Sequence, residues 1–133
     1  MSFKGNWKFV KGENVEKFML AAGAQAEKAK IAENATTTVS CDRNGDNFSI
    51  IITGEKGNTI EQKFQPGVPF TETFAVFGKE RQAVASVEGN TVTIKGVEPG
   101  TVVETREVNG DEMVFSMSKP GVDIVAKRYF QRA

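Results

Sequence analysis

Turn-forming sequences recur along most of this chain at intervals of about 8 to 12 residues, and this regularity limits the fold more than any other feature does. Several turns carry the Asn-Gly or Gly-Asn chemistry of short hairpin loops, so each strand is expected to pair with the next in an antiparallel meander. With strands also expected at residues 5–11 and 36–42, the prediction is ten strands. The turns lie at residues 44–46, 55–58, 65–67, 77–79, 88–90, 98–100, 109–111 and 119–121.

A ten-stranded meander leaves two long edge strands with unpaired backbone groups unless it closes on itself. Eight strands close around an interior that side chains just fill, so ten are expected to enclose a cavity. Phe3, Trp7 and Phe9 share one face of the first strand and are predicted to plug one end. The predicted fold class is therefore all-β, a ten-stranded antiparallel up-and-down β-barrel, in a single domain over residues 1–133.

Helical periodicity is confined to residues 13–33. Val15, Phe18, Met19 and Ala22 follow the spacing of one helix face, and Gly23 suits a C-terminal cap. A second short helix is predicted after this break. Its inner face would carry Ala26, Ala29 and either Ile31 or Ala32, and its outer face Glu27, Lys28, Lys30 and Glu33. This helix-turn-helix hairpin is expected to cover the other end of the barrel as a lid.

Acidic and basic residues balance, with 17 of each. The chain lacks the broad positive charge that a phosphate backbone requires, so no nucleic acid partner is expected. The first residues lack the apolar segment of a secretory signal, and no window approaches the roughly 18 apolar residues of a membrane span. Cys41 is the single cysteine, so a reducing, cytoplasmic location is expected.

Side chains suited to catalysis or metal binding are scarce. The chain has no histidine, which removes the commonest general base and most zinc sites. Cys41 lies in an alternating strand pattern and is interpreted as a small core residue, not a reactive thiol. The glycine-containing turns show no phosphate-loop pattern. We therefore expect a protein that is not an enzyme and that needs no metal or cofactor.

Two arginines are predicted to face the interior of the barrel. In the last strand, Arg128 shares a face with Ile124 and Phe130. In the strand over residues 101–109, Arg106 shares a face with Glu104, and the bulky residues of the next strand indicate that this face is the inner one. Both guanidinium groups are therefore expected to meet in a common cavity.

An unpaired guanidinium in an apolar cavity costs several kcal/mol, so each arginine needs an anion or retained water. One interpretation is that the two arginines bind the carboxylate of an apolar ligand through charge-assisted hydrogen bonds. The other is that Arg128 reaches the barrel rim, while Glu104, roughly 7 Å along the strand, neutralises Arg106. Strand spacing alone leaves both interpretations open.

The chain carries, in order, the motifs GNW at residues 5–7, ENVEKFMLAAG at 13–23, NGD at 44–46, FQPGVPF at 64–70, TREVNGDE at 105–112 and AKRYF at 126–130. As a set they resemble the intracellular lipid-binding protein family, which includes fatty-acid-binding and cellular retinoid-binding proteins. The resemblance covers the whole chain. It implies a barrel of two nearly orthogonal five-stranded sheets under two helices, which acts as a monomeric intracellular carrier of a long-chain fatty acid.

The resemblance also implies roles for particular residues. Arg106 and Arg128 match the two arginines that bind the ligand carboxylate, and Phe130 replaces the tyrosine of the family's Arg-any-Tyr pair. Glu104 occupies a position that is more often apolar or small, which favours retinoic acid or a bile-acid-like ligand as the alternative. The expected cavity lining is Phe130, Phe115, Met117, Val39 and Glu104, and the expected portal is Val15, Phe18, Met19, Phe74 and Val76.

Two other functions compete with a carrier: an enzyme that uses the barrel cavity, and a barrel that serves mainly as a protein-interaction module. The absence of histidine counts against the enzyme. Lys17, Lys28 and Lys30 of the helices are interpreted as a solvated face, with transient contact to anionic membranes as the second reading.

Overall fold

The computed structural model describes residues 3–74 and 79–133. Within them the chain forms ten strands and two helices, as the turn spacing predicts. The predicted turn at residues 77–79 lies largely outside the described residues. In chain order the elements are β1 (Gly5–Glu13), α1 (Val15–Ala21), α2 (Ala26–Asn34), β2 (Thr38–Asn44), β3 (Asn47–Thr53), β4 (Thr59–Phe64), β5 (Phe70–Phe74), β6 (Lys79–Glu88), β7 (Thr91–Gly96), β8 (Val103–Asn109), β9 (Glu112–Lys119) and β10 (Val122–Arg132).

Short loops join most neighbouring strands. Between β2 and β3 the loop consists of Gly45 and Asp46, and between β8 and β9 it consists of Gly110 and Asp111. Gly45 has a φ of 63° and Gly110 a φ of 62°, a region that glycine adopts without the steric cost that a Cβ atom brings. These tight turns force each strand to return beside the one before it.

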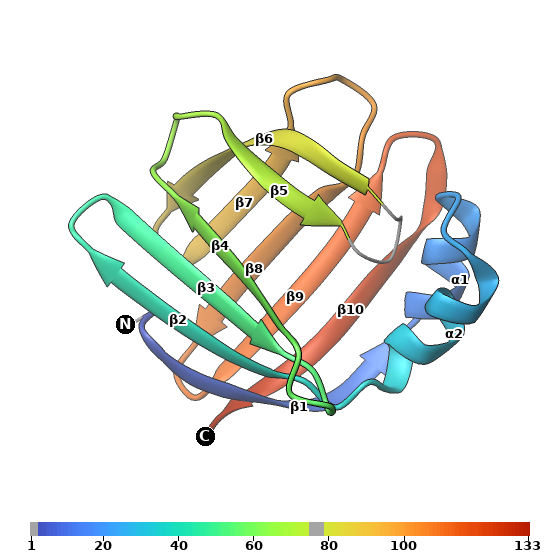
Figure 1. Ribbon diagram of the computed structural model, residues 1–133, viewed down its shortest axis with the longest axis horizontal. Helices are drawn as coiled ribbons and strands as arrows, with labels where there is room; N and C mark the ends of the chain where they lie inside the picture. The colour runs from blue at the N-terminus through green and yellow to red at the C-terminus, as the bar shows by residue number, and fades with distance from the viewer. Residues whose placement is uncertain (1–2, 75–78) are drawn as a thin grey trace.

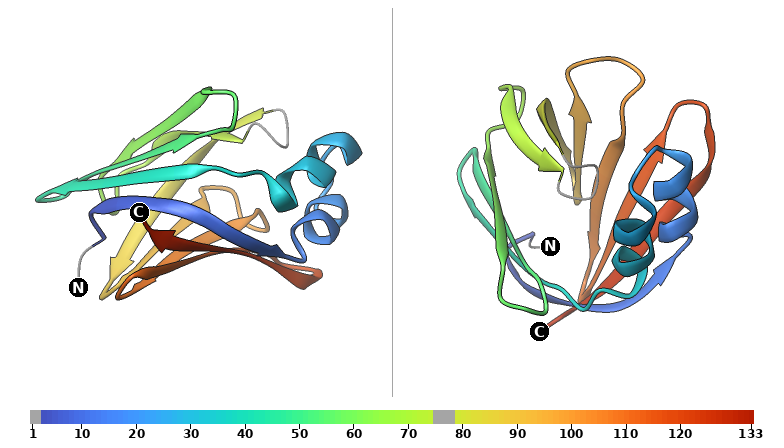
Figure 2. Two further views of the ribbon diagram at one scale, coloured as in Figure 1. Left: turned by 90° about the horizontal axis from the view of Figure 1, so that it is seen from below. Right: turned by 45° about the vertical axis from the view of Figure 1, so that its right-hand side comes forward.

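The ten strands form one antiparallel sheet in the order β4-β3-β2-β1-β10-β9-β8-β7-β6-β5. The sheet folds over so that β3, β4 and β5 lie in front of β8, β9 and β10 (Figure 1). The two sheets that the resemblance implies are thus two halves of one continuous sheet, seen as two layers in Figure 2. The prediction of a nearly closed ten-stranded barrel is confirmed.

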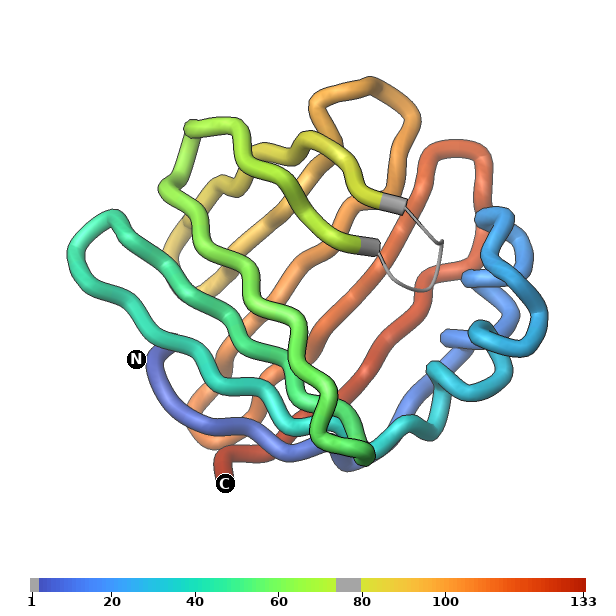
Figure 3. Tube along the Cα trace, viewed as in Figure 1, coloured from blue at the N-terminus to red at the C-terminus, as the bar shows by residue number. Residues whose placement is uncertain are grey.

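The two helices lie at one end of the barrel, away from the start of β1 (Figure 3). Helix α1 ends in a Schellman motif, because the N–H of Ala24 donates to the carbonyl of Met19 and that of Gly23 to the carbonyl of Leu20. On α2, Ala32 is buried whereas Ile31 is 68% exposed, which settles the two predicted alternatives. Ala26 is also exposed, contrary to its predicted inner position, because it is the first residue of α2.

Buried side chains gather in two clusters. The larger cluster fills the barrel end away from the helices and contains Trp7, with Phe3 and Phe9 packed against it. The smaller cluster lies under the lid and contains Phe18, Ala29 and other residues of both helices. Neither described helix is long and apolar enough to cross a membrane. Glu104, Arg106 and Arg128 face the space between the two clusters.

Candidate functional site: a charged cavity inside the barrel

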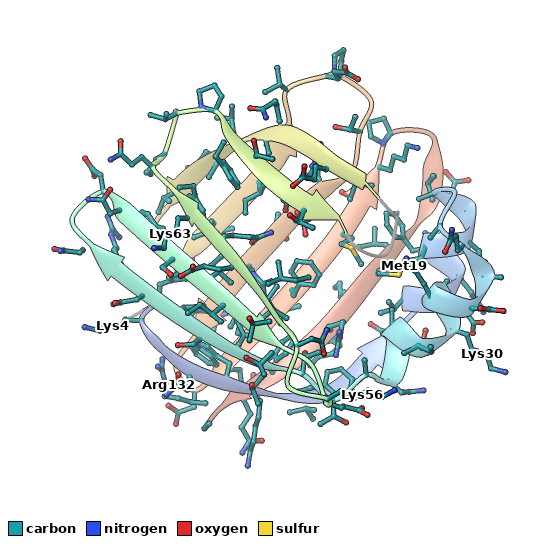
Figure 4. The ribbon with its side chains drawn as sticks, viewed as in Figure 1. Lys4, Met19, Lys30, Lys56, Lys63 and Arg132 are labelled. Carbon is teal, nitrogen blue, oxygen red and sulfur yellow. The ribbon has the colours of Figure 1, made fainter. Side chains whose placement is uncertain are left out.

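A cavity of about 180 Å³ lies between the two clusters of buried residues. Side chains from helix α1, from α2 and from seven strands face it. Figure 4 shows Met19 on the helix side of the barrel. The lining residues are Met19, Ala32, Thr37, Val39, Ile52, Ile60, Gln62, Thr73, Glu104, Arg106, Phe115, Met117, Arg128 and Phe130. The wall is therefore mostly apolar with a few polar groups, which is the usual composition of a small-molecule site.

Arg106 projects into this cavity from the middle of β8. Its side chain is 6% exposed, and its guanidinium carbon lies 4.3 Å from the ring centroid of Phe115. Within the described residues its only hydrogen bond runs from Nη1 to Sδ of Met113, at 3.9 Å. Burial lowers the pKa of Arg106, while the charges of Cys41, Glu104 and Glu72 act to raise it. The group thus keeps most of its capacity to bind an oxygen anion.

Arg128 reaches the same cavity from β10, nearer the helices. Its Nη2 donates to the backbone carbonyl of Ala35 and, at 3.4 Å, to Oγ1 of Thr37. Its Nε is buried and has no hydrogen-bond partner in the described part of the chain. The pKa of Arg128 is lowered to about 10, first by burial and then by the positive charge of Arg106. Arg128 therefore donates to protein groups through Nη2, while its buried Nε–H has no acceptor among the described residues.

Phe115 connects the two arginines. On β9 it pairs with Arg106 of β8 on one side and with Arg128 of β10 on the other. The guanidinium of Arg128 also lies 4.2 Å from the ring centroid of Phe9 and 5.5 Å from that of Phe130. Both guanidinium groups thus make cation–π contacts with aromatic faces. These contacts leave the in-plane N–H groups available for the hydrogen bonds that a carboxylate would accept.

A buried ion-pair network adjoins the cavity and reaches it through Glu104 and Gln62. Nε of Arg81 donates to Oε1 of Glu72 at 2.7 Å, and Nη2 of Arg81 lies 3.3 Å from Oε1 of Glu104. Gln62 donates to Oε2 of Glu72 at 3.0 Å, and Nη1 of Arg81 donates to the carbonyl of Val102 at 2.6 Å. Glu104 therefore forms an ion pair with Arg81, whereas the strand spacing suggested Arg106 as its partner.

The electrostatics of Glu104 are set by this network. Burial raises the pKa of Glu104 well above its ordinary value, and the hydrogen bond to Glu72 and the negative charge of Glu72 raise it further. The positive charges of Arg106 and Arg81 act in the opposite direction. Two buried carboxyl groups, of which Glu104 lines the cavity, thus interact with two guanidinium groups.

The structure brings the two predicted carboxylate-binding residues, Arg106 and Arg128, together at one cavity. All five residues predicted to line it do so, namely Phe130, Phe115, Met117, Val39 and Glu104. The predicted portal is divided, because Met19 lines the cavity whereas Val15 and Phe18 are fully buried between the helices and the barrel. The side chain of Phe74 and all of Val76 lie outside the described residues. The binding roles of all these residues stay predictions.

Sequence reasoning missed Gln62, Glu72 and Arg81. A signal for each was present: Gln62 shares strand parity with Phe64, Glu72 with Phe70, and Arg81 with Ala83, so all three polar side chains lie on the same strand face as core residues. Parity applied to every polar residue would have placed them inside. Among the described residues, no group of three or more acidic, histidine or cysteine side chains could hold a metal ion.

Comparisons with known proteins agree with this geometry, although no family model matches the chain. The chain is 32% identical over 134 residues to fatty acid-binding protein 2 of Manduca sexta, covering 98% of this chain and 99% of the relative. It is 33% identical over 135 residues to the human intestinal fatty acid-binding protein, with 99% of both chains covered. A Schistosoma mansoni fatty acid binding protein, solved in complex with arachidonic acid, superposes with a TM-score of 0.87 and 26% identity over 98% of this chain and 96% of that one.

Fold and cavity together define a helix-capped ten-stranded barrel of the lipid-binding type. The full-length identities above 30% go further: this chain belongs to the fatty-acid-binding protein family.

Proposed function

We propose that this protein is a carrier that binds a long-chain fatty acid inside its barrel, with the carboxylate at Arg106 and Arg128. The observation that carries the proposal is the state of Arg106, which is buried at the cavity with a single weak hydrogen bond to sulfur among the described residues. A carboxylate would give this guanidinium the two charge-assisted hydrogen bonds that its planar fork favours. Because Phe130 has no hydroxyl group, the arginines alone would bind the head.

Most of the affinity would come from the tail of the ligand. Burial of an acyl chain contributes about 0.8 kcal/mol per methylene, so some 14 methylenes offer on the order of 11 kcal/mol before ordering costs. Ile52, Ile60 and Met117 provide apolar lining for such a chain. The arginines would therefore select acids over other lipids and fix their orientation.

Replacement of Arg106 by Gln tests this proposal. Hydrogen bonds to charged groups contribute about 1.5 to 3 kcal/mol, so palmitate should bind about ten- to hundredfold more weakly, measured by calorimetry on delipidated protein. The corresponding fatty alcohol should bind the variant and the parent alike. Arg43→Gln, on the exposed end of β2, is the matched control and should leave both affinities unchanged. Equal palmitate affinity for Arg106→Gln and parent would refute the assigned role.

The polar lining supports a second candidate ligand class. Gln62, Thr73 and Glu104 line the cavity together with the arginines, and such groups can hydrogen-bond hydroxyl groups on a bile-acid-like ligand or a more polar acid. Retinoic acid, a rigid and mostly apolar acid, is a further alternative ligand for the same cavity. Competition among palmitate, retinoic acid and a bile acid for the delipidated protein separates these classes.

The oligomeric state, the cellular compartment and contact with membranes are further properties of the proposed carrier. We propose a monomer in a reducing, cytoplasmic compartment, because the single cysteine, Cys41, is free and buried. Leu20 and Ile31 are exposed on the helices near Lys17 and Lys30, an arrangement compatible with transient contact to an anionic membrane. Binding of delipidated protein to vesicles with and without anionic lipid tests this contact.

A further inference from the structure

Glu104 lies beside Arg106, where the head of an anionic ligand would bind. It lies on β8 two residues before Arg106, on the same inner face, and both side chains line the cavity. A carboxylate that is bound at Arg106 would therefore be a third acidic group close to Glu104 and Glu72. In a cavity of low dielectric, like charges at this separation cannot all stay ionised without a large cost.

The charged and titratable neighbours of Glu104 come from three strands. Glu72 faces it from β5, Arg81 from β6, and Arg106 from its own strand β8. Its partners on the two adjacent strands, Ile94 on β7 and Met117 on β9, cannot titrate. The protonation state of Glu104 therefore depends on one other carboxyl group and two guanidinium groups inside the barrel.

The charge balance of this group depends on one proton. With Glu104 ionised, the charges of Glu72 and Glu104 offset those of Arg81 and Arg106, so that Arg128 alone is left to offset a ligand carboxylate. With a proton on Glu104, one more positive charge in this group is available to the ligand. Arg128 is half-buried and already donates to Ala35 and Thr37, so the proton on Glu104 strengthens the attraction at Arg106 itself.

A second pocket adjoins the network. Arg81 also lines a groove of about 470 Å³, together with Thr101, Val102 and Lys119. Its guanidinium spans from this groove to the carboxylate of Glu104 in the inner cavity. Glu104 is therefore separated from this groove by the side chain of Arg81.

We propose that Glu104 is a proton-accepting specificity residue, and that binding of an acidic lipid at Arg106 is accompanied by uptake of one proton from water onto Glu104. This inference rests on the proposed function. A lipid with a neutral head would bring no charge and would bind without proton uptake. The cavity thereby distinguishes an acid from an alcohol by charge compensation as well as by hydrogen bonds.

Proton uptake predicts a definite pH dependence. The ligand raises the affinity of Glu104 for its proton, so uptake occurs between the pKa of Glu104 in the free protein and its higher pKa in the complex. Within that window the affinity for palmitate falls as pH rises, by up to tenfold per pH unit for one proton. The free-protein pKa is already raised by burial and by Glu72, which moves the window above the ordinary titration range of a carboxyl group.

Calorimetric titration with palmitate between about pH 6 and 8, below the titration of Arg128 near 10, in buffers of different ionisation enthalpy, counts the protons taken up. The parent is expected to take up as much as one proton per ligand within the window. Glu104→Gln should take up none, and its affinity should stay at the low-pH value of the parent throughout. Glu107→Gln removes the same charge from the exposed face of β8 and should behave as the parent does.

A second variant keeps the test decisive if Glu104→Gln folds poorly. Glu72→Gln removes the like charge beside Glu104, so uptake should persist and move to lower pH. Equal proton uptake by the parent and Glu104→Gln, or uptake by neither, overturns this inference while leaving the carrier function intact. Failure of the parent to bind palmitate at any pH overturns the proposed function and this inference with it.

Discussion

The buried ion pair between Glu72 and Arg81 offers a quantitative test of how the cavity wall is held together. Side-chain exposure is 0% for Glu72 and 10% for Arg81, and the two groups approach to 2.7 Å. Removal of one partner leaves a buried charge without compensation, which typically costs about 3 to 5 kcal/mol. Glu72→Met and Arg81→Met should each destabilise the protein by about this amount.

The structure predicts an asymmetry between these two variants. In Glu72→Met, Arg81 keeps Glu104 at 3.3 Å and the carbonyl of Val102 at 2.6 Å. In Arg81→Met, two buried carboxyl groups lose a shared donor at once. Arg81→Met should therefore lie at the upper end of the range and Glu72→Met at the lower end.

The double variant measures the coupling directly. Replacement of both partners of a buried ion pair by apolar residues of similar volume is often close to neutral. Glu72→Met/Arg81→Met should therefore be destabilised by at least about 2 kcal/mol less than the sum of the single variants. The measurement is guanidinium denaturation of delipidated protein, since bound lipid would stabilise each variant unequally.

A surface pair provides the control. Glu61 and Lys63 approach to 3.8 Å with side-chain exposures of 46% and 72%, and exposed pairs contribute at most about 1 kcal/mol. Glu61→Gln should change the stability little. Single losses under about 1 kcal/mol for Glu72 and Arg81, or energies that add within about 0.5 kcal/mol, would refute the assignment of the network as a buried, mutually compensating unit.

Two further predictions concern the core. Phe18 is fully buried under the lid, so Phe18→Ala should cost about 3 to 5 kcal/mol in chemical denaturation, whereas Leu20→Ala, at a residue 46% exposed, should cost less than about 1 kcal/mol; similar losses for both would contradict the packing. Burial raises the pKa of Cys41 from 9.0 to about 11, with Arg106 acting in the opposite direction, so the thiol in the unfolded chain ionises first as pH rises. The parent should therefore lose about 2 to 3 kcal/mol more stability than Cys41→Ala between pH 9 and 11, and parallel stability curves for the two would argue against a buried neutral thiol.

The alternation of side chains along each strand predicts much of this site from the sequence alone. It places Arg106, Arg128 and Glu104 on the inner faces of β8 and β10, where the structure has them. The Gly23 cap and the hairpin turns are equally local, because they depend on φ angles that glycine adopts without cost. The choice between Ile31 and Ala32 lay beyond such reasoning, since the helical spacing allows either residue and the docking of the helix against the barrel buries Ala32 and exposes Ile31.

The sequence by itself determined the number of strands and the hairpin order, which follow from turn chemistry. It predicted inward arginines from the two-residue period of a strand together with the bulky residues of neighbouring strands. Only the tertiary structure decided that Glu104 meets Arg81 and Glu72, from strands β6 and β5. Parity specifies a face of the sheet. The way the sheet folds over specifies which charges on that face come within bonding distance, and here it places Arg81 at 3.3 Å from Glu104.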